Sequence, residues 1–107
     1  MAGDSVPELT NGEFKDFVSE GFVLVDFFAE WCMPCLMMSP VLDELSEKFD
    51  GRIKFGKINV EENSEIAQKF NVSSIPNLVL LKDGEVVDSF VGAISAEDLE
   101  EKLRGYL

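Results

Sequence analysis

The hydrophobic residues of this chain alternate between short continuous runs and positions spaced three or four residues apart, a pattern typical of strands alternating with helices. Residues 22–29 are apolar on both faces except at Asp26, so we expect a central strand whose sheet is covered by helices on both sides. Three further runs are rich in β-forming residues and predict strands at residues 53–60, 78–81 and 86–91. The sequence Lys82-Asp83-Gly84-Glu85 joins the last two runs and predicts a hairpin.

The segments between these runs carry apolar residues three or four positions apart, which indicates helices. A capping box at Thr10-Asn11-Gly12-Glu13 predicts a first helix that ends near Gly21. Apolar positions at i, i+3, i+4 and i+7 within residues 38–49 predict a second helix. Shorter helices are expected at residues 64–70 and from Ser95 towards the C-terminus.

Together these elements predict a single α/β domain over residues 1–107. The expected architecture is a central mixed β-sheet of about five strands, flanked on both faces by about four helices. The count of strands includes an edge strand at residues 6–9, where Pro7 removes one hydrogen-bond donor. We expect residues 1–5 to be flexible.

The chain is strongly acidic, with 21 Asp and Glu residues against 9 Lys and Arg and a net charge of −12. A surface of this sign repels phosphate groups and anionic lipids, so we expect neither a nucleic acid nor a membrane as a partner. The N-terminus shows no secretory signal, and no apolar run is long enough to cross a bilayer. We therefore expect a cytoplasmic protein, and nothing in the sequence requires more than a monomer.

Both cysteines and the single tryptophan lie in one stretch, Trp31-Cys32-Met33-Pro34-Cys35, between the central strand and the second helix. Such a pair can close a disulfide, provide half of a metal site, or simply pack. The chain has no histidine and no other cysteine, so it lacks the further ligands of a zinc site. A dimer that shares a metal cluster through four sulfurs remains an alternative.

The place of the pair at a helix N-terminus suggests different roles for the two thiols. Unpaired amides and the positive end of the helix dipole favour a thiolate at Cys32, and a thiolate is the species that attacks a disulfide. Cys35 lies one turn further into the helix, where we expect it to be less exposed and to act as the resolving thiol.

Two other positions each allow two interpretations. The apolar neighbours of Asp26 would bury its carboxylate, raise its pKa and make it a proton acceptor near neutral pH, but an exposed acid at a strand end fits the sequence equally well. Ile75-Pro76 precedes a strand, where the proline either starts the strand or follows a cis peptide bond that shapes a binding surface.

With these residues in place, the chain resembles the thioredoxin family over almost its whole length. The resemblance is carried by the block of residues 25–35, apart from Phe28 and Met33, and by Pro40, Lys57, Ile75-Pro76, Lys82-Asp83-Gly84 and Gly92. The resemblance implies the thioredoxin fold and a cis bond before Pro76. It also implies that Cys32 is the nucleophile, that Cys35 resolves the mixed disulfide, and that the two form a redox-active disulfide.

The resemblance further implies that buried Asp26 assists Cys35 by accepting its proton, and that Lys57 tunes Asp26. A groove for an extended substrate segment would be lined by Trp31, Pro34, Ile75, Pro76 and Gly92. The implied activity is that of a protein-disulfide reductase, which is re-reduced by a thioredoxin reductase. Electrons would come from NADPH through that flavoprotein, and the chain itself would bind no cofactor and no metal.

Some positions depart from the family pattern. Met33 replaces a usual glycine, Leu36 a common lysine, Ser74 a common glycine and Phe28 a frequent second tryptophan. These changes concern redox potential and choice of partner rather than the reaction. Two alternatives remain: a glutaredoxin-like protein that uses glutathione, against which Trp31 argues, and a thioredoxin-fold module for binding or assembly, including the cysteine-bridged metal dimer.

Overall fold

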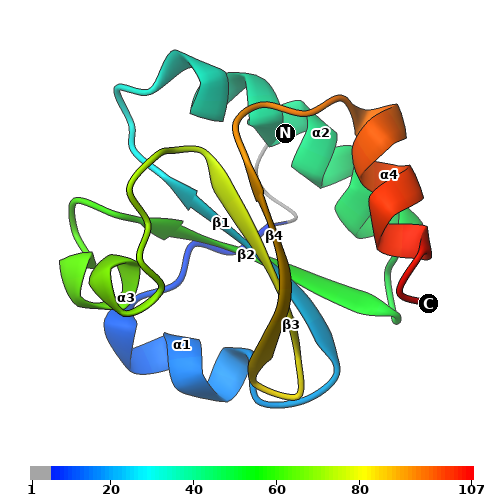
Figure 1. Cartoon of the computed structure of the whole chain (residues 1–107), viewed down its shortest axis with the longest axis horizontal. Helices are drawn as coiled ribbons and strands as arrows, with labels where there is room; N and C mark the ends of the chain where they lie inside the picture. The colour runs from blue at the N-terminus through cyan, green and yellow to red at the C-terminus, as the bar shows by residue number, and fades with distance from the viewer. Residues whose placement is uncertain (1–5) are drawn as a thin grey trace.

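Figure 1 shows the fold in a computed structural model, which describes residues 6–107. Within this range the chain forms four helices and four strands. In chain order they are α1 (Asn11–Phe17), β1 (Phe22–Phe28), α2 (Met33–Lys48), β2 (Ile53–Asn59), α3 (Ser64–Lys69), β3 (Asn77–Lys82), β4 (Glu85–Val91) and α4 (Ala96–Arg104). None of these helices is long and apolar enough to cross a membrane. The expected flexibility of residues 1–5 concerns a segment outside the described residues.

β1 lies inside a mixed sheet whose strand order is β2-β1-β3-β4. It pairs in parallel with β2 and antiparallel with β3, and β3 turns back into β4. The turn is the two-residue loop Asp83-Gly84, whose φ angles of 50° and 85° suit a tight hairpin. The predicted α/β fold class, the internal position of β1 and the hairpin are therefore confirmed.

The sheet has four strands among the described residues, where about five were predicted. The missing strand is the segment at residues 6–9, which forms only one bridge, between Glu8 and Lys57. The Lys57 N–H donates to the Pro7 carbonyl (2.9 Å), but Pro7 has no N–H to return to the ladder. The segment therefore lies against β2 without extending the sheet.

The helices form two layers, with α2 and α4 on one face of the sheet and α1 and α3 on the other (Figure 1). Side chains of β1 alternate between these layers. Leu24 belongs to the core under α2 and α4, whereas Val25 and Phe27 belong to the core under α1 and α3. Both faces of β1 are thus buried, as the apolar residues on both of its faces predict.

Helix α1 begins as predicted but ends early. At its start the Thr10 N–H donates to Glu13 Oε1 (2.9 Å), which is one half of the expected capping box. The helix ends at Phe17 rather than near Gly21. The Ser19 hydroxyl donates to the Asp16 carbonyl (2.8 Å), a local side-chain bond that competes with a further helical turn.

The close packing of β2 against the N-terminal segment leads to a stability prediction at Gly56. A Cβ at this position would lie 2.8 Å from Leu9 Cδ1 and 3.0 Å from Phe17 Cε2. We expect Gly56→Ala to lower the free energy of unfolding by about 1–3 kcal/mol through overpacking. Gly12→Ala is the control. Apart from the backbone of its own helix, no atom of residues 6–107 lies within 4 Å of the methyl group that this substitution adds. Urea denaturation checks the prediction, and equal midpoints for the two variants would contradict it.

Candidate active site

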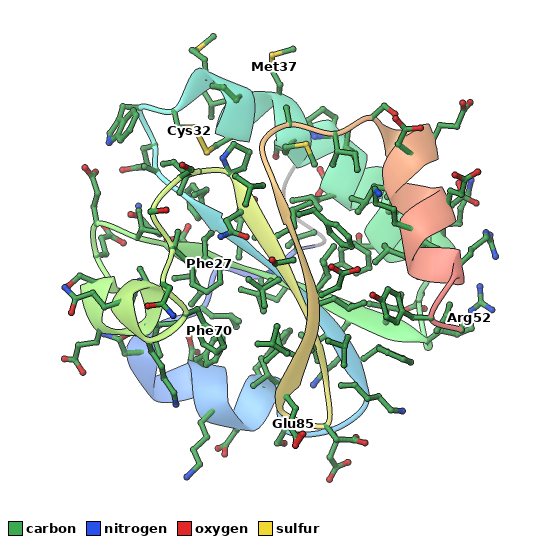
Figure 2. The ribbon with its side chains drawn as sticks, in the orientation of Figure 1. Phe27, Cys32, Met37, Arg52, Phe70 and Glu85 are labelled. Carbon is green, nitrogen blue, oxygen red and sulfur yellow. A yellow bond between two sulfur atoms is a disulfide. The ribbon has the colours of Figure 1, made fainter. Side chains whose placement is uncertain are left out.

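The cysteine pair lies at the junction between the end of β1 and the start of α2. Cys32 is the N-cap residue of α2, and Cys35 is in its first turn. The two are joined by a disulfide, with their Cα atoms 5.2 Å apart. Figure 2 shows Cys32 at the end of the molecule where α2 begins. The predicted placement of the pair at a helix N-terminus is confirmed.

The two sulfurs differ in what they face, not in how exposed they are. Cys32 and Cys35 are both 4% exposed, so the expectation that Cys35 would be less exposed is wrong for this oxidised form. Both residues belong to one small cluster with Ala29, against which Ile75 also packs. Cys32 Sγ accepts the Cys35 N–H (3.3 Å) and lies 4.0 Å from the Ile75 carbonyl oxygen.

Cys35 instead lines a cavity that it shares with Asp26. The cavity has a volume of about 60 Å³. Its polar lining consists of Asp26, Ser39, Asp43 and Lys57. This volume is large enough to admit water beside Asp26 and Cys35.

Asp26 is buried, which decides between the two interpretations of its sequence context. It lies within β1 at 4% exposure, and its Oδ1 has no hydrogen-bond partner among the described residues. Burial raises the pKa of Asp26 to about 7, because a carboxylate loses its hydration in this site. The positive charge of Lys57 lowers the pKa but does not cancel the effect of burial.

Lys57 reaches this site from the neighbouring strand. In the parallel register of β1 and β2, Lys57 is the partner of Asp26. Its side chain is half-buried and lines the cavity, and its Nζ lies 5.6 Å from the centre of the Phe28 ring. The structure therefore brings together Asp26, Lys57 and Cys35, which the sequence places on three separate elements.

The peptide bond between Ile75 and Pro76 is cis, as the family resemblance implies. Ile75 is half-buried and packs beside the disulfide, whereas Pro76 is buried. The Gly92 N–H donates to the Pro76 carbonyl (2.8 Å), and Gly92 has a φ of 94°, which favours glycine. These three residues thus lie together on the Cys32 side of the disulfide.

Trp31 and Pro34 are exposed on either side of Cys32 in the chain. The indole of Trp31 is held at its polar edge, where Nε1 donates to Glu61 Oε2 (2.9 Å). Glu61 lies in the loop after β2, which runs next to the loop after β1 because the Val60 N–H donates to the Phe28 carbonyl (2.8 Å). The ring of Trp31 is therefore oriented although most of it is open to solvent.

Three polar residues near the disulfide were not predicted from the sequence: Ser39, Asp43 and Glu61. Ser39 and Asp43 line the cavity because they follow Cys35 at i+4 and i+8 on one face of α2, so helical spacing could have identified them. Glu61 gave no such signal, because its bond to Trp31 joins loops that are 30 residues apart. Within residues 6–107 no group of three or more His, Cys, Asp or Glu side chains is arranged to hold a metal ion.

Comparisons with known proteins agree with one another. The family model described as Thioredoxin matches residues 5–105. The thioredoxin of Bacillus subtilis is 46% identical over 103 residues, which cover 96% of this chain and 99% of that protein. The thioredoxin of Listeria monocytogenes is 44% identical over 102 residues, covering 95% and 99%. That of Synechocystis is 42% identical over 105 residues, covering 96% and 98%.

Proposed function

Because this chain belongs to the thioredoxin family and is a thiol–disulfide oxidoreductase of proteins, we propose that Cys32 is its nucleophile and Cys35 its resolving thiol. The observation that carries the proposal is the different surroundings of the two sulfurs. Cys32 accepts an amide N–H at the start of α2 and lies next to Ile75, whereas Cys35 shares a cavity with Asp26. Amide donors and the helix dipole stabilise a thiolate at Cys32.

The proposed reaction runs in two displacements. The Cys32 thiolate attacks one sulfur of a substrate disulfide, which forms a mixed disulfide and releases the other substrate sulfur as a thiolate. Cys35 then loses its proton and attacks Cys32 Sγ, which closes the Cys32–Cys35 disulfide and releases the second substrate thiol. Two electrons pass from the chain to the substrate.

Asp26 is proposed to take the proton from Cys35 in the second displacement. A carboxylate with a pKa of about 7 is a suitable base near neutral pH, because it is partly ionised and still binds a proton readily. Lys57 would tune this group, because its positive charge favours the ionised form of Asp26.

The substrate would bind as an extended segment across Cys32. Its groove is proposed to be lined by Trp31, Pro34, Ile75, Pro76 and Gly92. The partners are disulfide-containing proteins and a thioredoxin reductase, through which a flavin passes electrons from NADPH. The chain would bind no cofactor or metal of its own and would act as a cytoplasmic monomer.

Turnover assays test this function. With NADPH and a bacterial thioredoxin reductase, catalytic amounts of the chain should sustain the reduction of a disulfide-bonded protein, followed as NADPH oxidation. Failure to accelerate that reduction with either the reductase or dithiothreitol would contradict the assignment. Stoichiometric metal that survives mild chelation in the purified chain would instead support the cysteine-bridged dimer.

The role of Asp26 predicts the pH dependence of the second displacement. A mixed disulfide between Cys32 and a small thiol, formed and held at low pH, removes the Cys32 thiol from the titration. After a jump in pH, its rate of release should rise through pH values near 7 as Asp26 ionises. In Asp26→Asn the inflection near pH 7 should be lost, which leaves only the rise caused by ionisation of Cys35 itself, and release should be slower at pH 8. Identical profiles for parent and variant would show that Asp26 does not take the proton.

A further inference from the structure

Four large apolar side chains are exposed at the end of the molecule that carries the disulfide. Trp31, Met33, Leu36 and Met37 are 67%, 65%, 52% and 68% exposed. Met33, Leu36 and Met37 stand at i, i+3 and i+4 of α2, so their side chains adjoin one another. Figure 2 shows Met37 projecting outward at the same end of the molecule as Cys32. We call the exposed side chains of these four residues the redox face.

The redox face continues into a shallow hollow beside Met37. The hollow has a volume of about 280 Å³ and lies between α2 and the segment after Gly92. It is lined by Met37, Met38, Val41, Ala93, Ile94 and Ser95. Flexible methionine side chains around an apolar hollow next to a reactive group are suited to contact with varied protein segments.

Positive charge is absent from the segments that meet at the redox face. Residues 28–47 and the loops at residues 60–63, 71–76 and 92–95 contain no Lys or Arg. Negative charge is present there, with Glu30 in the loop before Cys32 and with Glu61 and Glu62 in the adjoining loop. Glu61 is held against the face by its hydrogen bond to Trp31.

The cations of the sheet lie at its opposite end. Lys54 is paired with Val23 and Lys82 with Phe22, at the start of β1, whereas the disulfide follows the end of that strand. The two ends of β1, Phe22 and Phe28, are six residues apart, which corresponds to roughly 20 Å along the strand. The Debye length at physiological ionic strength is about 8 Å, so these cations are screened from the redox face. Lys57 is closer but is half-buried beside Asp26.

We propose that the redox face selects protein disulfides whose flanking residues are Lys or Arg and disfavours those flanked by Asp or Glu. This proposal rests on the proposed function and names the substrate class of that same site. Apolar contact with the face supplies non-specific affinity, and the uncompensated acids beside it decide which segments approach. Leu36 contributes by leaving an apolar side chain where a lysine would offset those acids.

Two cyclic peptides provide the test. Each contains one disulfide and the same phenylalanine, and they differ only in carrying two Lys or two Glu residues next to the cysteines. The second-order rate constant for oxidation of the reduced chain is measured for both. At low salt the Lys peptide should react about tenfold faster, the lower end of what electrostatic steering supplies. At about 1 M salt, where the Debye length is about 3 Å, the ratio should fall towards one.

Paired double variants locate the effect on the molecule. Glu30→Gln with Glu62→Gln removes two negative charges beside the redox face. Glu20→Gln with Glu85→Gln removes the same charge from the other end, where Figure 2 shows Glu85 far from Cys32. The first variant should lower the ratio of the two rate constants substantially, and the second should leave it unchanged.

The outcomes separate this proposal from the proposed function. Equal rates for the two peptides at low salt, or equal effects of the two double variants, would overturn the charge preference while leaving disulfide reduction intact. If neither peptide oxidised the reduced chain, the proposed function itself would be wrong.

Discussion

Replacing Asp26 by Asn is expected to stabilise the folded chain more at pH 8 than at pH 5, by about 2.5 kcal/mol in the free energy of unfolding. The carboxyl group has a pKa of about 7 in the folded chain against 3.8 as an ordinary side chain. Between these values the folded chain holds a proton that the unfolded chain has released. Stability therefore falls as the pH rises from about 4 to about 7, and the substitution removes this loss.

Urea denaturation at both pH values measures the effect. The cost of fitting an amide into the cavity is the same at pH 5 and pH 8, so the difference between the two isolates the ionisation of Asp26. Asp50→Asn is the matched control, because Asp50 is exposed at the end of α2. If the free energies of unfolding of Asp26→Asn and of the parent differed by the same amount at pH 5 and pH 8, the Asp26 carboxylate would not be desolvated in the way the structure indicates.

Replacing Cys32 by Ser should lower the turnover of protein disulfides by on the order of 10³-fold or more, because a serine hydroxyl is not ionised near neutral pH. The measurement is dithiothreitol-driven or reductase-driven reduction of a disulfide-bonded protein. Ser73→Ala serves as the control, because Ser73 is an exposed hydroxyl in the loop before Ile75. Full activity in Cys32→Ser would remove Cys32 from the mechanism.

Much of the fold follows from local patterns in the sequence. The run that became β1 is apolar on both faces because both faces are buried, and this placed it inside the sheet. The cysteine pair was placed correctly because a strand pattern ends and a helical pattern begins on either side of it. The fifth strand was overcounted because the apolar residues at 6–9 suggest a strand, while Pro7 limits the segment to a single bridge.

Other features of the site depend on contacts that no local pattern encodes. The two cysteines are equally buried, and both pack in one cluster with Ala29 and Ile75. The burial of Asp26 depends on the helix α2 above it, so its apolar neighbours in sequence could not decide the matter. The position of Trp31 depends on Glu61, which comes from a different loop.

The most direct test of the central claim compares Cys35→Ser and Cys32→Ser as traps for a disulfide peptide at neutral pH. Each variant keeps one thiol and loses the same internal disulfide, so the comparison isolates the environment of the remaining sulfur. We predict that Cys35→Ser forms a mixed disulfide at least about tenfold faster, because Cys32 lies at the helix N-terminus that favours the thiolate. Equal rates, or faster trapping by Cys32→Ser, would contradict the assignment of Cys32 as the nucleophile.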